Sequence, residues 1–170
     1  ARKSKFSTAL IPEITTFKYL VNEKGSDSSA LDNMIEILVK GGIDTFRALR
    51  MVLPPAWQNI HMMDPEIKSF HEYNSMHMEA WDGPAGIVMS DGRWAICLLD
   101  RNGLRPARYQ IDNEGYVTIA SEIGVFPQDE SNFITKGRIG AGGIFAIDTE
   151  TVELIYHSII DFKLKECKPY

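Results

Sequence analysis

Apolar residues in the first half of the chain recur at the spacing of amphipathic helices. The clearest pattern lies in the helix expected at residues 27–40. Its apolar stripe consists of Leu31, Ile35, Leu38 and Gly42, with Met34 and Ile37 beside it. Side chains three and four positions apart share one helix face, so this stripe predicts a helix that packs on a core. Asp27, Ser28 and Ser29 are candidate N-caps, and Gly41-Gly42 is expected to end the helix.

Two further helices are expected before residue 80. One covers residues 44–53 with Phe46, Leu49 and Leu53 facing inward, and Pro54-Pro55 ends it because proline cannot continue a helix. The other begins at Asp64, which is followed by a proline at the first helical position and by an acid in the first turn. Its expected apolar stripe consists of Ile67, Phe70, Tyr73 or Asn74, and Met78.

After Trp81 the pattern changes to short apolar runs separated by turn residues. Three β-hairpins are expected, at residues 84–99 around Asp91-Gly92, at 107–121 around residues 112–115, and at 143–156 around residues 148–150. Helices followed by antiparallel strands predict an α+β fold, because parallel sheets alternate strands and helices along the chain. No linker stands out, so a single domain is expected over residues 1–170; residues 1–24 are weakly patterned and interrupted at Ile11-Pro12.

The composition is that of a globular domain. The chain has 170 residues, of which 44% are hydrophobic and 24% charged, and this excludes disordered, collagen-like and coiled-coil chains. The net charge of −5 argues against a general nucleic-acid surface, and no apolar run approaches the roughly 18 residues of a membrane span. The chain starts at Ala1 within a polar stretch, which suggests a piece of a longer protein.

The two cysteines do not provide a disulfide framework or a four-ligand zinc site. Cys97 lies in the apolar run at residues 95–99 and is expected to be a buried small hydrophobe, whereas Cys167 lies in a lysine-rich tail. This cysteine usage indicates a reducing, cytoplasmic compartment.

Two histidine motifs resemble metal sites but are incomplete. His71-Glu72 begins like the HExxH of zinc proteases, but Ser75 holds the fifth position. His77 and Glu79 begin like a deaminase motif, but no PCxxC follows. The histidines are six residues apart and do not share a helix face well. Both are interpreted as surface or partly buried helix residues, and no metal site is predicted.

Stretches rich in glycine and arginine also lack a complete motif. The glycines precede a strand rather than a helix, so they fit a turn better than a dinucleotide-binding loop; they are Gly137, Gly140, Gly142 and Gly143. Four arginines occur within sixteen residues: Arg93, Arg101, Arg105 and Arg108. They could bind a phosphate or a carboxylate, but in an acidic chain they are interpreted as partners of buried carbonyls and of acids such as Asp100 and Glu122.

Three segments, taken together, carry a resemblance to a known family. They are GSDSSALDN at residues 25–33, MEAWDGPA at 78–85 and LDRNGLRPARY at 99–109. Their order and spacing resemble the class II glutamine amidotransferase domain found in glutamate synthase large subunits. ASEIGV at residues 120–125 and KGR at 136–138 fit the same pattern. The resemblance covers residues 1 to about 150, and DRNGLRPARY is its most specific part.

The resemblance implies a fold and a reaction. The fold is an N-terminal-nucleophile αββα sandwich, with two antiparallel sheets between helices, of which this chain would be a part. In the reaction, an N-terminal cysteine with its own α-amino group as base attacks the side-chain amide of glutamine, and water releases glutamate from the thioester. In the full enzymes the ammonia reaches a flavin domain, combines with 2-oxoglutarate and yields, after reduction, a second glutamate.

The chain departs from the family pattern at its start. Residue 1 is Ala rather than Cys. The family's nucleophile, carboxylate-binding arginine and Asn-Gly oxyanion pair precede the segment that matches Ala1, so no catalytic residue is assigned. The chain resembles the C-terminal part of the glutaminase domain. Alone, it is expected to lack glutaminase activity and to be marginally stable or to self-associate, since a half-sandwich leaves strand edges uncovered.

One substrate contact follows from the resemblance. The aspartate of the GSDS motif matches Asp27 and is expected to bind the α-amino group of glutamine, with Gly25 and Ser26 lining the pocket through their backbone. The alternative is that Asp27 only caps a helix. Five residues are expected to form a structural network behind the nucleophile's place: Arg101, Asn102, Arg105, Ser121 and Glu122. Residues 81–84 are interpreted as a turn with Trp81 buried.

The resemblance also implies partners and cofactors. Glutamine is the expected substrate, and the remaining domains of the large subunit are the expected partners. No cofactor is expected in this chain, because the FMN and the iron–sulfur cluster would lie in domains beyond Tyr170. The expected location is the cytoplasm, or the plastid stroma if ferredoxin is the electron donor. Nucleic acids and membranes are not expected as partners.

Two other interpretations stay open. Another class II amidotransferase, of the phosphoribosyl or glucosamine type, would share the motifs, but the long helical stretch at residues 28–79 argues against it. A non-catalytic binding or assembly module would keep the fold and lose the chemistry. The sequence upstream of Ala1 separates these interpretations, since a cleavable Cys-Gly start with a downstream flavin domain would favour the glutaminase.

Overall fold

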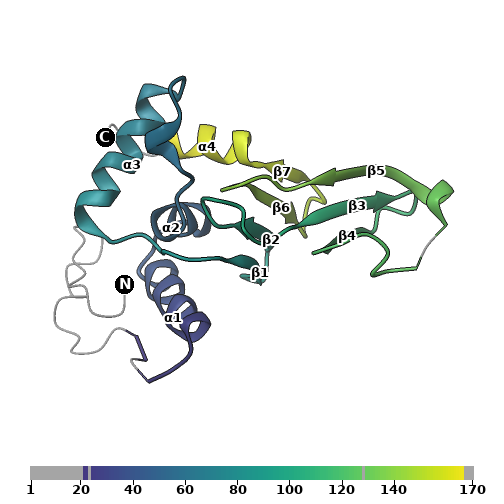
Figure 1. Ribbon diagram of the computed structural model, residues 1–170, viewed down its shortest axis with the longest axis horizontal. Coiled ribbons are helices and arrows are strands. Elements are labelled where there is room, and N and C mark those ends of the chain that lie inside the picture. Colours follow the sequence, from purple (N-terminus) through teal and green to yellow (C-terminus); the bar gives the residue numbers. More distant parts are fainter. Residues whose placement is uncertain (1–20, 23, 128, 167–170) are drawn as a thin grey trace. The chain divides into compact units, whose positions relative to one another are not determined.

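The structure is a computed structural model that describes residues 21, 22, 24–127 and 129–166. The Ile11-Pro12 break and Cys167 lie outside the described residues. The described residues form two compact units, one made of the residues up to Asp82 and those from Asp161 onward, the other of residues Gly83–Ile160. Figure 1 labels their helices and strands in chain order.

Helix α1 spans Asp27–Lys40, and the residue that caps it was not among those expected. Its N-cap is Ser26, whose Oγ accepts a hydrogen bond from the Ser29 amide at 3.2 Å. The candidates Asp27, Ser28 and Ser29 are therefore wrong as caps, because the helix already begins at Asp27. The predicted apolar stripe is confirmed except at Gly42, which is exposed and lies beyond the end of the helix. Ile37 is half-buried, and the buried side chains are Ala30, Leu31, Met34, Ile35 and Leu38.

Helices α2 (Thr45–Val52) and α3 (Pro65–His77) begin after the predicted aspartates. Asp44 accepts the amides of Phe46 and Arg47, and Asp64 accepts that of Glu66. All of α2 is buried, and it ends before Pro54 as predicted. In α3, Asn74 rather than Tyr73 completes the stripe, since Asn74 is buried and donates its Nδ2–H to the Phe70 carbonyl at 2.7 Å. A short 3-10 helix, Trp57–Asn59, lies between α2 and α3 in the chain.

The hydrophobic pattern does not predict helix α4 (His157–Glu166), where lysines surround a narrow apolar stripe. Ile160 and Leu164, four positions apart, are almost completely buried. Two ion pairs connect the second half of α4 with α2 and with the N-cap of α3, which belong to the same unit. Asp161 pairs with Nε of Arg50 at 3.1 Å, and Lys165 pairs with Asp64 at 2.6 Å.

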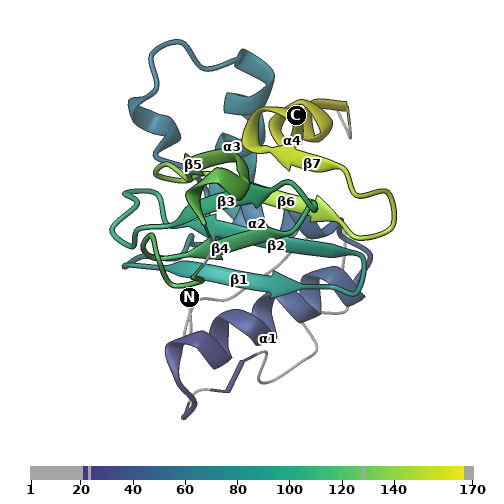
Figure 2. The same ribbon diagram turned by 90° about the vertical axis from the view of Figure 1, so that its right-hand side faces the viewer.

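Two antiparallel sheets form the unit Gly83–Ile160. The first has the order β1-β2-β6-β7 and comprises Gly86–Ser90, Trp94–Leu99, Ile144–Asp148 and Leu154–Tyr156. The second has the order β4-β3-β5 and comprises Val117–Ala120, Arg108–Asp112 and Phe133–Arg138. Figure 2 shows β3 between its two neighbours. The three predicted hairpins are the pairs β1–β2, β3–β4 and β6–β7. The α+β fold with antiparallel sheets is thus confirmed, and β5 is an addition to it.

An aromatic and aliphatic core joins the two sheets. Its buried members are Cys97, Leu99, Ala107, Ile139 and Phe145. The ring of Tyr109, on β3, stacks on that of Phe145, on β6, with centroids 4.6 Å apart. In β2 and β6 the residues of the opposite face are buried too, among them Ile96, Leu98 and Ala146. These two central strands are therefore buried on both faces.

Gly137 in β5 lies directly opposite Tyr109 in the register of β3 and β5. A Cβ atom at Gly137 would lie 2.4 Å from the Tyr109 ring, far inside van der Waals contact. The tyrosine ring therefore fills the space that a side chain at residue 137 would need. This glycine belongs to a strand, whereas Gly140, Gly142 and Gly143 form the expected turn before β6.

Candidate functional site

The predicted substrate residues lie at the N-terminal end of α1. Gly25 is half-buried, and Ser26 and Asp27 are exposed. The backbone turns tightly here: the Gly25 amide donates to the Asn22 carbonyl at 3.1 Å, and a Cβ at Gly25 would lie 3.0 Å from Nδ2 of Asn22. The Asn22 amide in turn donates to Oδ1 of Asn33 on α1 at 3.2 Å. Asn22, just before the GSDS segment, is thus bound both to Gly25 and to α1.

The capping geometry separates the roles of Ser26 and Asp27. The Ser26 hydroxyl makes the cap hydrogen bond, and it also contacts the Ser28 hydroxyl at 3.0 Å. The Asp27 carboxylate is consequently not needed as the cap, which was the alternative to a substrate role. It lies in the first turn, where the helix dipole favours a negative charge. An exposed carboxylate at this end of the helix can accept hydrogen bonds from a cationic ligand.

The DRNGLRP segment forms the loop between β2 and β3, and Asp100 organises it. This buried carboxylate accepts hydrogen bonds from the amides of Ala85 and Asn102, both at 3.0 Å. Burial by itself would raise the pKa of Asp100, but the backbone amides outweigh burial and lower it. The prediction that arginine side chains bind Asp100 is therefore wrong, because its hydrogen-bond donors are backbone amides.

Gly103 allows the same loop to pack closely against the turn before β6. Its φ of 61° is left-handed, and a Cβ there would lie 2.9 Å from Cα of Ala141. The amide of Gly142 donates to the Asp100 carbonyl at 2.8 Å, which holds the two loops together. Glycine is required at residue 103 both by its conformation and by this close approach.

The five predicted support residues all lie in the unit Gly83–Ile160, and all are exposed. Arg101, Asn102 and Arg105 belong to the β2–β3 loop, where the Arg105 stem packs on Gly86. Ser121 and Glu122 follow β4 and belong to a different loop. Their role behind a nucleophile stays a prediction.

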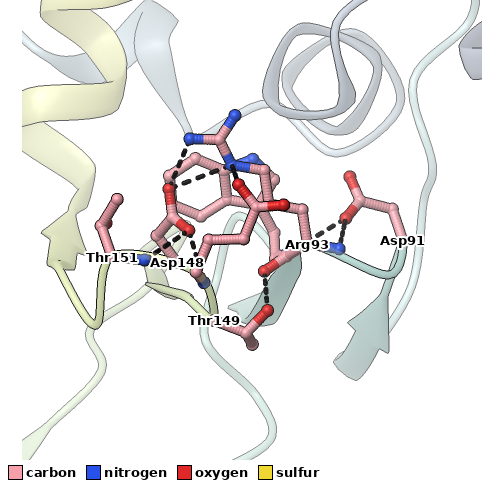
Figure 3. A network of polar contacts seen from close by, with 7 residues as sticks. Asp91, Arg93, Asp148, Thr149 and Thr151 are labelled. Atoms are coloured by element: carbon pink, nitrogen blue, oxygen red, sulfur yellow. Dashed lines mark hydrogen bonds and ion pairs between the residues drawn. The ribbon is translucent and has the colours of Figure 1, made fainter.

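Arg93 forms an ion pair with Asp148, in a network of polar contacts that joins two turns (Figure 3). The guanidinium donates to Oδ2 of Asp148 at 2.7 and 3.1 Å, while Oδ1 accepts the amides of Glu150 and Thr151. The side-chain hydrogen bonds from Arg93 are the largest cause that lowers the pKa of Asp148 to about 2. This network closes the ends of the β1–β2 and β6–β7 hairpins.

The sequence patterns do not predict that His71 and Arg50 are both buried and lie near each other. His71 is 3% exposed, stacks on Trp57 and has no hydrogen-bond partner at Nε2 within the part of the chain that the structure describes. The interpretation of His71 as a surface or partly buried residue is wrong, while His77 is exposed as expected. Burial first, and the nearby Arg50 second, lower the pKa of His71 to about 4.

Trp81 is half-buried rather than buried. Its backbone amide donates to the Val52 carbonyl at 2.7 Å, which ties the WDGP segment to the end of α2. The chain bends at Gly83, whose φ is 125°. The segment after Trp81 is therefore a bend that leads into β1.

Cys97 is confirmed as a buried small hydrophobe. It is 2% exposed, and burial raises the pKa of its thiol to about 11. A thiol in this environment is protonated at neutral pH and is not a nucleophile. Among the described residues, no group of three or more His, Cys, Asp or Glu side chains is placed to hold a metal ion. No helix within the described ranges is both long and apolar enough to span a membrane.

The fold and the motifs define the class of this protein. The family model of the class-II glutamine amidotransferases matches residues 1–170, and the chain belongs to this family. The α+β architecture with two antiparallel sheets agrees with it.

Curated relatives narrow the comparison to glutamate synthases. The chain is 39% identical over 150 residues to the chloroplastic ferredoxin-dependent glutamate synthase of Oryza sativa subsp. japonica, covering 86% of this chain and 9% of that protein. It is 40% identical over 137 residues to the NADH glutamate synthase of Saccharomyces cerevisiae, covering 80% and 6%. It is 35% identical over 171 residues to the NADPH glutamate synthase large chain of Bacillus subtilis, covering 100% and 11%. The chain thus spans about a tenth or less of the first two relatives and 11% of the third.

Proposed function

We propose that this chain is the part of a glutamate synthase glutaminase domain that binds the α-ammonium group of glutamine, and that Asp27 is the residue that binds it. The observation that carries the proposal is the position of Asp27. Its carboxylate lies in the first turn of α1, exposed, with the cap hydrogen bond made by Ser26 instead. The relatives, which are named as glutamate synthases, support the choice of reaction.

The electrostatics of a helix start explain why an aspartate is needed. The N-terminal end of a helix carries a partial positive charge, which repels an ammonium group. A carboxylate in the first turn reverses the local sign and forms a charge-assisted hydrogen bond with the ammonium. Gly25 and Ser26 immediately precede Asp27 in a tight turn, which supports the proposal that these two residues line the substrate pocket through their backbone.

In the whole protein, the glutaminase domain releases ammonia from glutamine, and the ammonia is transferred to 2-oxoglutarate to form glutamate. A flavin and an iron–sulfur cluster in other parts of the protein would supply the electrons for that synthesis. No residue of this chain is assigned to either group. The chain alone is proposed to be inactive as a glutaminase.

The test is the substitution Asp27→Asn in the full-length protein encoded by its gene. Loss of one charge pair with the substrate should weaken the specificity constant for glutamine about 30-fold to several thousand-fold. Activity with free ammonia should persist, because ammonia does not use the glutamine pocket. Asp32→Asn is the matched control, since it removes one exposed carboxylate from the same helix.

The outcomes separate the competing functions. If glutamine-dependent and ammonia-dependent activities fall together with the melting temperature, Asp27 is structural. Unchanged activity with both donors means that Asp27 does not bind the substrate. Absence of any glutaminase activity in the full-length protein would favour the non-catalytic binding or assembly module.

A further inference from the structure

The sheet β4-β3-β5 has a polar face opposite to its core face. Tyr109, Val117 and Ile119 pack into the core between the sheets. The residues that alternate with them on the three strands have their side chains on the other face, because successive side chains of a strand alternate. The loop after β4 follows this face, and together they line a pocket of about 220 Å³.

Two arginines line this pocket from neighbouring strands. Arg108 on β3 and Arg138 on β5 are direct partners in the register of the two strands, and both line the pocket. Like charges directly opposite each other destabilise a sheet. Within the part of the chain that the structure describes, neither guanidinium forms an ion pair, so no carboxylate of these residues relieves the repulsion between them.

The other charges of the pocket do not neutralise this pair. Lys136 lines it as well, with its Nζ 3.4 Å from Glu130 and 4.6 Å from the Phe133 ring centroid. Glu122 is the carboxylate that lines the pocket. Three cationic side chains therefore face one anionic side chain, although the chain as a whole is acidic.

The loop supplies an apolar wall. Ile123, Val125 and Phe126 line the pocket and are 65%, 59% and 50% exposed. The lining of the pocket therefore combines cationic and large apolar side chains. An arginine guanidinium can bind a carboxylate or a phosphate through two hydrogen bonds, and here two arginines line the same pocket.

We propose that this pocket binds a small organic oxyanion, whose carboxylate or phosphate lies between Arg108 and Arg138 and whose apolar body lies against Ile123, Val125 and Phe126. The anion relieves the repulsion of the arginine pair, and a volume of about 220 Å³ suits a small molecule. This site is distinct in composition from the Asp27 segment, which presents an anionic group to a cationic ligand.

The experiment measures binding to the full-length protein by calorimetry, with glutarate and phenyl phosphate as probes and the neutral glutaramide as the control ligand. Arg108→Gln and Arg138→Gln should each weaken binding of the anions by at least about tenfold, the effect of losing hydrogen bonds to a charged group. Glu122→Gln should strengthen binding about two- to fivefold, since it removes a competing carboxylate. Lys40→Gln, which removes a cation from α1, should leave binding unchanged.

Melting temperatures without ligand separate a binding role from a structural one. The proposal expects Arg138→Gln to be as stable as the native protein or more stable, because the like-charge pair is removed. A lower melting temperature would mean that Arg138 holds the sheet together, and Arg138→Lys then tests binding with the charge kept. Binding of glutarate alone, or of phenyl phosphate alone, identifies which oxyanion the site takes. The proposal is overturned if neither anion binds, or if the arginine variants bind them like the native protein.

Discussion

His71 is the side chain whose environment departs most from what its neighbours in sequence suggest. It lies on α3 among polar residues, yet it is packed against Trp57 and Phe70 and is close to Arg50. Trp57 and Arg50 lie outside α3, so a pattern within that helix cannot reveal them. A buried neutral imidazole next to a cation cannot accept a proton without a cost to stability.

This arrangement predicts that stability falls on mild acidification. The unfolded chain binds a proton at His71 near pH 6.5, whereas the folded protein does so only at about pH 4. The unfolding free energy should therefore decrease as the pH falls from about 6.5 to 4, by about 3 kcal/mol in total from this residue. Urea unfolding at a series of pH values measures the effect.

His71→Gln should remove most of this dependence between pH 6.5 and 4. His77→Gln is the matched control, because His77 lies on the same helix but is exposed. If the pH dependence of His71→Gln matches that of the native protein, another group is responsible for the acid sensitivity.

At the level of secondary structure elements, polar contacts between turns stabilise the unit Gly83–Ile160. Arg93 and Asp148 belong to different hairpins, and Asp148 also binds the two amides that form its own turn. Because one carboxylate serves the guanidinium and the turn amides together, loss of that carboxylate would leave several donors without an acceptor.

Asp148→Asn should lower the melting temperature by several degrees, by the usual scaling for a domain of this size. The folded pKa of Asp148 lies below its ordinary value of 3.8, so its stabilising effect is present above pH 3.8 and disappears as the pH falls toward about 2. Differential scanning calorimetry at pH 7 and pH 2.5 should show a smaller difference between variant and native protein at pH 2.5. Glu150→Gln, which changes an exposed and more distant partner of Arg93, should have little effect.

The sequence was most informative where local rules decide the structure. Asp91-Gly92 specified a hairpin, and Asp64-Pro65 specified a helix start, because turn and cap chemistry involve only neighbouring residues. The cap of α1 was misplaced, since Ser26 and Asp27 are equally suitable by type and only the backbone geometry distinguishes them. Strand β5 was missed because its Thr, Lys, Gly and Arg residues form a strand only through pairing with β3.

For the candidate site, the motif predicts Asp27, and the structure places this residue in the first turn of α1. The pocket at Arg108 and Arg138 was not foreseen. Arg108 was grouped with three arginines close to it in sequence, whereas its neighbour in space is thirty residues further on. Strand register depends on long-range pairing, which a list of nearby residues does not contain.

For the chain as a whole, the state of Cys97 bears on what the chain can do alone. Cys97 is buried with a raised pKa, and its thiol is not available to attack an amide. We therefore expect that the purified 170-residue chain releases no glutamate from glutamine, since loss of a nucleophile removes many orders of magnitude of rate. A coupled glutamate assay, with the full-length protein as the positive control, measures this. Turnover that survives Cys97→Ser and Cys167→Ser would contradict the prediction.

The contact between Tyr109 and Gly137 makes the substitutions that evolution can accept at one position depend on the residue at the other. As long as an aromatic ring is present at residue 109, every mutation that places a side chain at residue 137 meets atoms already there. A change at residue 137 becomes acceptable only after residue 109 has become smaller, and that first step would open a void beside Phe145. Neither order of substitution passes through a well-packed intermediate, so lineages that carry this pair are expected to keep it or to replace both residues together.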